Sequence, residues 1–179
     1  FLAEVDRLAQ EVEERSPEGL FRLPIDRVFT IKGFGTVVTG TIISGTASIG
    51  DTLEVLPRGL EAKVRGIQAH GNSVESATAG LRAGINLQGL ETGDIDRGNV
   101  LVLSQTLKPT AVLDVVFQLL PGAPRPLKNR TRIRLHLGTA EVLGRVIPLA
   151  REEVKPGEEA FMQIRLEKPI VALPGDHFV

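Results

Sequence analysis

A run of alternating basic residues carries the clearest chemistry in this sequence. From Arg130 to Leu137 it reads Arg-Thr-Arg-Ile-Arg-Leu-His-Leu. Successive side chains of a β-strand point to opposite faces, so the leucines and the isoleucine would face a core. The opposite face would carry side chains about 7 Å apart that could follow a phosphate backbone, namely Arg130, Arg132, Arg134 and His136. A solvated strand face would show the same pattern, and the residues alone leave the two interpretations evenly matched.

The positive charge of this sequence is concentrated around this run and is not spread over the whole chain. The whole chain of 179 residues has a net charge of −1, which would not recruit nucleic acid or membrane by itself. No acidic residue occurs between Asp114 and Glu141, and residues 105–179 carry eleven basic and eight acidic residues. We therefore expect any contact with a polyanion to lie in this second part of the chain.

Motifs for catalysis are absent or incomplete. Gly35 to Gly40 has the glycine spacing of a phosphate loop, but Thr41 and Ile42 stand where Lys and Ser or Thr are required. Glycines that kink a strand explain the spacing better. The three histidines lie far apart without metal-ligand spacing, and no cysteine is present, which excludes disulfides and thiolate sites and favours the cytoplasm. We predict that this chain is not itself an enzyme.

The elements that must position these residues are mostly short strands. Residues 2–15 have helical spacing of apolar side chains, and Ser16-Pro17-Glu18-Gly19 would end that helix. From Phe21 onward the period is two, with turns at Gly, Pro and Asn. No run is long enough to span a membrane as a helix. The predicted strands are 23–30, 36–44, 52–56, 62–70, 84–90, 100–103, 112–119, 131–137, 140–147 and 159–166.

About ten short antiparallel strands without crossover helices predict an all-β fold of two barrels after one short N-terminal helix. The boundary between the barrels is expected in residues 104–110, which gives domains at 21–104 and 105–179. Because the helix begins on Phe1 and residues 177–179 resemble the opening of a strand, we expect an internal fragment of a longer chain. Residues 1–20 would then be the end of a preceding domain and a linker.

Several sequence blocks resemble one protein family in order. Residues 21–41, which contain Lys-Gly-Phe-Gly-Thr-Val-Val-Thr-Gly-Thr, resemble the start of the second domain of translational GTPases. Residues 63–68, 79–87 and 95–98 continue that pattern, and Leu135 to Val142 with the ending through Pro169 resembles the third domain of selenocysteine-specific elongation factors in particular. The resemblance covers residues 21–179 and identifies residues 1–20 with the final helix of a truncated GTPase domain.

The resemblance implies barrels that bind selenocysteinyl-tRNA for delivery to the ribosome at recoded UGA codons. The GTPase domain, with GTP and magnesium, would lie outside this chain, as would a C-terminal domain that binds the selenocysteine-insertion element of the mRNA. No cofactor is implied for the fragment itself, and no membrane partner.

The resemblance also implies site residues. The family's aminoacyl pocket corresponds here to Asp26, Arg27 and Arg82, and its terminal adenosine pocket to Asp94 and Arg97. A selenol is far more acidic than a thiol, whose pKa is about 8.5, and is therefore an anion at pH 7. A pocket that separates it from a neutral seryl group needs positive charge held by a carboxylate. Asp26 and Arg27 are adjacent, so Asp26 can orient Arg27 only if the strand is bulged, or it must act on Arg82 instead.

Three alternatives remain open. A related translational GTPase would carry standard aminoacyl-tRNA, as elongation factor Tu does, or initiator tRNA, as the gamma subunit of initiation factor 2 does, and would not need the two arginines of the pocket. A sulfate-activating GTPase subunit has similar barrels and would bind a partner subunit. A purely structural pair of barrels would have no affinity for RNA.

Overall fold

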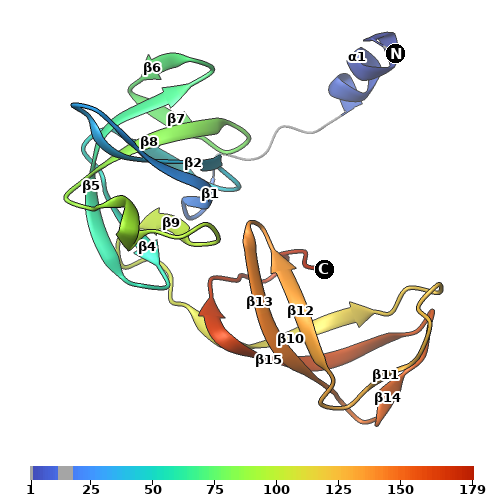
Figure 1. Ribbon diagram of the computed structural model, residues 1–179. Coiled ribbons are helices and arrows are strands. Elements are labelled where there is room, and N and C mark those ends of the chain that lie inside the picture. Colours follow the sequence, from blue (N-terminus) through green and yellow to red (C-terminus); the bar gives the residue numbers. More distant parts are fainter. Residues whose placement is uncertain (1, 12–17) are drawn as a thin grey trace.

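The computed structural model describes residues 2–11 and 18–179, and the strands form two units joined at residues 104–109 (Figure 1). The helix α1 (Leu2–Glu11) confirms the short N-terminal helix. Residues 12–17, which include the rest of the predicted helix and most of its predicted stop, lie outside the described residues. The domain limits at 21–104 and 105–179 stay predictions.

The first unit is a closed antiparallel barrel. Its strands pair in the order β4-β9-β1-β2-β8-β5, the additional pairing of β4 with β5 closes the ring, and β6 adds to β5. β3 and β7 form a separate two-stranded sheet. The strands are β1 (Arg22–Ile31), β2 (Gly35–Thr41), β3 (Thr46–Ser48), β4 (Thr52–Leu56), β5 (Leu60–Ala69), β6 (Asn72–Val74), β7 (Ser76–Thr78), β8 (Arg82–Gln88) and β9 (Val100–Leu103), with a 3₁₀ turn, η1 (Thr92–Asp94), between β8 and β9.

The barrel core follows from alternation that is interrupted at bulges. In β5, Ala62 and Val64 are buried, and after the register shift next to Gly66 the buried positions become Ile67 and Ala69. One extra residue reverses which positions face inward, because the side-chain period of a strand is two. The interior is filled by apolar side chains, each of which contributes roughly 1.5–3 kcal/mol when fully buried, among them Phe21, Leu23, Ile25, Val38, Ile42, Leu53, Ile85 and Leu101.

The second unit is built around a four-stranded antiparallel sheet in the order β10-β15-β13-β12, with a two-stranded sheet of β11 and β14. Leu135, Val146, Met162 and Ile164 are fully buried on its inner side. Val179 exchanges two backbone hydrogen bonds with His136 of β12, at 2.6 and 3.0 Å. The strands are β10 (Thr110–Gln118), β11 (Leu127–Lys128), β12 (Arg132–Leu137), β13 (Ala140–Pro148), β14 (Glu153–Val154) and β15 (Glu159–Ile170).

The two units are in direct contact. Arg22 of β1 forms a bidentate ion pair with Asp176, at 2.7 and 3.0 Å, and the two side chains are only 11% and 17% exposed. Leu56 and Val102 of the barrel pack with Val171, which follows β15. Close backbone approach is also required, because a Cβ on Gly138 would lie 3.3 Å from the ring of Pro24. The contact therefore has an apolar part and a nearly buried charged part.

The predicted all-β fold with antiparallel barrel strands is confirmed, and each of the ten predicted strands is present. Five strands of two or three residues, β3, β6, β7, β11 and β14, were not predicted. No helix in the described part of the chain is long and apolar enough to cross a membrane.

Candidate functional site

A bulge in β1 places Asp26 and Arg27 outside the core. Ile25 pairs with Gly40 of β2 and Arg27 pairs with Thr39, so Asp26 is an extra residue in β1 that has no residue opposite it in β2. Before the bulge Ile25 is buried, and after it Val28 packs against the core while Arg27 is exposed. The bulge shifts the alternation by one residue, and the two charged side chains thereby avoid the barrel interior.

Asp26 is bonded to Arg82, which reaches it from β8 across β2. Nη1 of Arg82 donates to Oδ2 of Asp26, and Nη2 donates to Oδ1 at 3.0 Å. Thr39 of β2 lies between them: its hydroxyl donates to Oδ1 of Asp26 at 2.8 Å and accepts from Nη2 of Arg82 at 3.4 Å. The Asp26 side chain is 24% exposed and that of Arg82 53%. We call this set the Asp26 network.

The network favours the charged form of Asp26. The hydrogen bonds from Arg82 lower the pKa of Asp26 below its ordinary value; burial opposes them, and Thr39 and the charges of Arg82 and Arg27 add to the lowering. Arg27 has no hydrogen-bond or ion-pair partner among the described residues, and its charge lies close enough to act on Asp26. The structure thus brings the three residues of the predicted aminoacyl pocket together, with one acid between two bases.

Asp94 and Arg97 lie in the segment between β8 and β9. Asp94 ends the 3₁₀ turn, and its carboxylate accepts the backbone N–H of Glu91 at 2.8 Å. Arg97 is exposed and lies three residues before the start of β9. An open hollow of about 350 Å³ lies beside this turn and is lined by Phe34, Arg65, Glu91 and other residues, but Asp94 and Arg97 are not among them.

The glycine-rich segment that has the spacing of a phosphate loop is strand β2. A Cβ on Gly40 would lie 2.3 Å from the carbonyl oxygen of Pro24, so glycine is required there for the close pairing of β1 and β2. No group of three or more His, Asp or Glu in residues 2–11 and 18–179 is arranged to hold a metal ion.

The predicted basic stripe begins at Arg132, not at Arg130. Arg130 precedes β12 with a φ of 62°, in the left-handed region, and is therefore outside the alternation. Arg132, Arg134 and His136 are exposed as predicted, while Leu135 is buried. Arg132 forms a bidentate ion pair with Glu167 of β15, at 2.8 and 2.9 Å, and Arg134 pairs with Glu141 at 3.2 Å.

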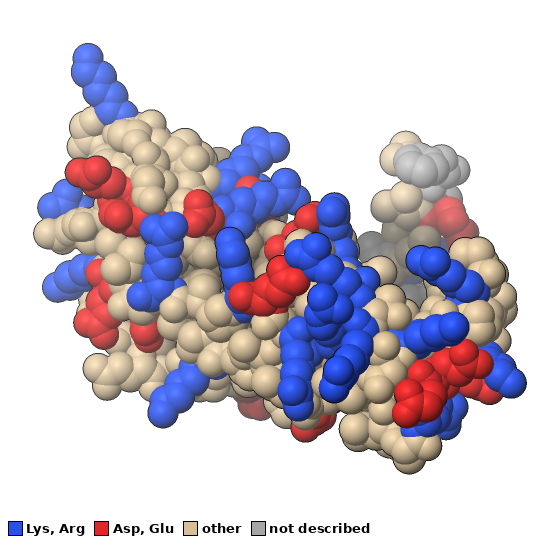
Figure 2. Space-filling view, turned by 60° about the horizontal axis from the view of Figure 1, so that its bottom comes forward, with Lys and Arg blue, Asp and Glu red and all other residues tan. Residues whose placement is uncertain are grey.

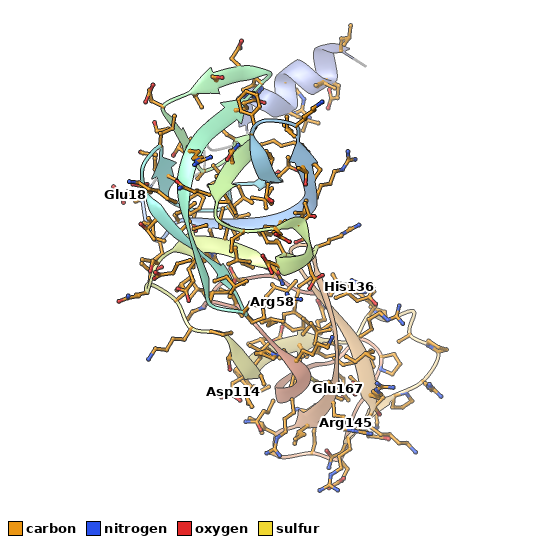
Figure 3. All side chains as sticks on the ribbon, turned by 60° about the vertical axis from the view of Figure 1, so that its left-hand side comes forward. Glu18, Arg58, Asp114, His136, Arg145 and Glu167 are labelled. Atoms are coloured by element: carbon orange, nitrogen blue, oxygen red, sulfur yellow. The ribbon has the colours of Figure 1, made fainter. Side chains whose placement is uncertain are left out.

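Sequence reasoning missed two arginines beside this stripe. Arg145 of β13 and Arg165 of β15 are exposed on the same sheet face, and Figure 3 shows Arg145 next to Glu167. Space-filling shows Lys and Arg side chains gathered in a dense group near the middle of one face of the molecule (Figure 2). The alternation in β13 and β15 is visible in the sequence, but the pairing register that joins these arginines is not.

Two family models match the chain. Elongation factor Tu domain 2 matches residues 35–102, and the beta-barrel domain of the selenocysteine-specific elongation factor matches residues 114–179. Two curated relatives are both named selenocysteine-specific elongation factor. The relative from Desulfomicrobium baculatum is 48% identical over 160 residues, and that from Methanocaldococcus jannaschii is 32% identical over 176 residues.

Solved structures agree with these matches. A bacterial selenocysteine-specific elongation factor superposes with a TM-score of 0.80 at 26% identity over 99% of this chain. The apo form of translation elongation factor SelB from Methanococcus maripaludis gives 0.85 at 31% identity over 98% of the chain. The chain covers 25% and 38% of the two curated relatives, and 28% and 40% of the two solved chains.

Proposed function

Because this chain belongs to the family of selenocysteine-specific elongation factors, we propose that its two barrels bind the aminoacyl end and stem of selenocysteinyl-tRNA. The matches to the second domain of elongation factor Tu and to the family's beta-barrel domain support this proposal, as does the order of the two units. The observation that carries it is the Asp26 network with Arg27 beside it.

The charge count of this group suits the ligand. Asp26 neutralises one of the two cations, Arg27 and Arg82, and one net positive charge remains for one selenolate. A carboxylate that bonds Arg82 through both oxygens fixes the guanidinium, and an ordered cation loses less entropy when an anion arrives. A neutral seryl group of similar shape would leave that charge without a partner. We expect discrimination of about 10–100-fold from this difference.

Two further contacts belong to the proposal. Asp94 and Arg97 would hold the terminal adenosine, and Arg130, Arg132 and Arg134 would contact the tRNA backbone. The domain limits at 21–104 and 105–179 are kept, with residues 1–20 assigned to the end of a GTPase domain.

The wider activity would be GTP-dependent delivery of this tRNA to the ribosome at recoded UGA codons, in the cytoplasm. GTP and magnesium would bind a domain outside this sequence, and a further domain would bind the selenocysteine-insertion element of the mRNA. The described residues would supply recognition and no catalytic group.

The test measures how fast two tRNAs dissociate from a full-length factor that contains this chain, with GTP bound. Arg27→Ala and Arg82→Ala should each accelerate release of selenocysteinyl-tRNA by about tenfold or more, because an anion loses a charged partner. Seryl-tRNA should be released at an unchanged or slightly lower rate.

Lys63→Ala is a suitable control, since Lys63 is an exposed cation of β5 in the same barrel and outside the Asp26 network. It should leave both rates unchanged. If Arg27→Ala and Arg82→Ala accelerate the release of both tRNAs equally, the two arginines are general contacts to the tRNA backbone. The chain is then better assigned to a factor that carries standard aminoacyl-tRNA.

A further inference from the structure

Three arginines of the second unit stand in one row across three neighbouring strands. Arg132 of β12 is directly opposite Arg145 of β13, and Arg145 is directly opposite Arg165 of β15. Residues directly opposite each other in antiparallel strands share a sheet face, and neighbouring strands are about 4.8 Å apart. The three side chains, all exposed, therefore leave the backbone within about 10 Å of each other. We call them the arginine row.

The arginine row lowers the stability of the folded chain when no ligand is bound. Like charges directly opposite on neighbouring strands destabilise a sheet. Glu167 pairs with Arg132, and its pKa is lowered mainly by hydrogen bonds from Arg132 and to a smaller extent by the charge of Arg145. Among the described residues, Arg145 donates a side-chain hydrogen bond to the carbonyl oxygen of Arg130, and Arg165 donates one to the side-chain amide oxygen of Gln163. Neither Arg145 nor Arg165 has a carboxylate within ion-pairing distance in the described part of the chain.

We propose that the arginine row binds the phosphate backbone of an RNA, with Arg145 and Arg165 as the principal contacts. The proposal rests on the proposed tRNA binding and moves its second contact surface from a stripe along β12 to a row across the sheet. The guanidinium group offers parallel donors that match two phosphate oxygens, and the row contains arginine alone. Three closely spaced arginines with Glu167 as the acid beside them can bind a polyanion whose charges repeat at regular intervals, as those of a phosphodiester backbone do.

The test uses the 179-residue chain and a fluorescently labelled, unacylated tRNA transcript, with anisotropy titrations at several salt concentrations. Arg145→Gln and Arg165→Gln should each weaken binding about 3- to 10-fold at low salt. Each should also lower the slope of log K against log salt by about one unit, and the double variant by about two. Stability should be unchanged or slightly higher, because a like-charge contact is removed.

Arg151→Gln is the matched control: Arg151 is an exposed arginine of the same unit that pairs with Glu158, outside the row. It should leave the affinity and the slope at the wild-type values. An unchanged slope in the Arg145/Arg165 double variant, with wild-type binding intact, would overturn the arginine row and leave the aminoacyl pocket standing.

Two other outcomes also count against the row. The Arg145/Arg165 double variant should lose less affinity for poly-L-glutamate than for the transcript. If the two losses are equal, the site recognises carboxylates as well as phosphates, and the assignment to phosphate is wrong. If the wild-type chain does not bind the transcript at any salt concentration, tRNA binding by these barrels and the arginine row are both overturned.

Discussion

Arg82 in the first unit and the pair Arg145 and Arg165 in the second differ in whether an acid neutralises them. In the first barrel, Arg82 is held by Asp26 through two hydrogen bonds, with the Thr39 hydroxyl between them. In the second unit, Arg145 and Arg165 stand directly opposite each other without an acid in ion-pairing range among the described residues. A neutralised cation can fix geometry by itself, whereas crowded free cations lower the stability of the fold until an anion binds. The comparison suggests a pocket for one charge in the first unit and a surface for many charges in the second.

The comparison assumes that both surfaces belong to one rigid body, and the ion pair between the units tests that assumption with the largest expected effect. Asp176→Ala should destabilise the chain by about 2–4 kcal/mol, because it leaves the guanidinium of Arg22 nearly buried without its partner. The measurement is the free energy of unfolding from urea titration.

Arg151→Ala, which removes an exposed ion-pair partner in the second unit, is the control and should change stability by less than about 0.5 kcal/mol. The double variant Arg22→Met/Asp176→Leu should recover part of the loss, since no buried charge is then left unpaired. A loss below about 0.5 kcal/mol for Asp176→Ala would mean that the apolar contacts alone join the units.

The Asp26 network gives the next largest effect. Asp26→Asn should cost about 1 kcal/mol at pH 7, because the amide nitrogen cannot accept a hydrogen bond: one of the two bonds to Arg82 is lost and the other loses its charge, while Arg82 is half exposed. The pKa of Asp26 is lowered in the folded state, so its contribution to stability is present above the ordinary value of 3.8 and is lost as the pH falls through the lower folded-state value.

Unfolding of the wild type and Asp26→Asn should therefore be compared between pH 7 and pH 2. The difference in free energy should be constant above about pH 5 and shrink below pH 4. A difference that does not depend on pH would show that the ionised carboxylate is not the source of the stabilisation.

Much of this comparison could be predicted from the sequence, and the Asp26 network shows why. Strict alternation implied that Asp26 and Arg27 could not lie on one face of a regular strand, which left a bulge or a bond to Arg82 as solutions. The structure has both. The bulge could be expected because it depends on a single strand, whereas Arg82, which lies on β8, was named through the resemblance to the family. Thr39 was missed because a threonine in a strand is usual and gives no signal of its own.

The arginine row could not be predicted because it depends on three strands at once. The sequence shows which residues of β13 and β15 face solvent, but the register between strands is set by the packing of the core beneath them. Arg130 is exposed as predicted but lies outside β12, because it adopts a left-handed conformation just before the strand. The sequence has no glycine or asparagine at that position to indicate this conformation.

The smallest expected effect would separate the two units most clearly. Glu167 is exposed and pairs with Arg132, so Glu167→Gln should leave the free energy of unfolding nearly unchanged. The same change removes the acid that competes with phosphate for Arg132 and that lies near Arg145. Binding of the tRNA transcript should therefore become about 2- to 3-fold tighter at low salt, with a steeper salt slope.

The control is the same change in an Arg132→Gln background. There Glu167→Gln should increase the affinity for the transcript less, because Arg132 is no longer present for Glu167 and phosphate to compete for. This double-mutant cycle assigns the effect to the Arg132–Glu167 pair. Asp26→Asn provides the contrast, since removing that acid frees a cation in a pocket for one aminoacyl group and should not steepen the salt dependence. If Glu167→Gln weakens binding, then Glu167 orients Arg132 for its ligand as Asp26 orients Arg82, and the two units use one principle instead of two.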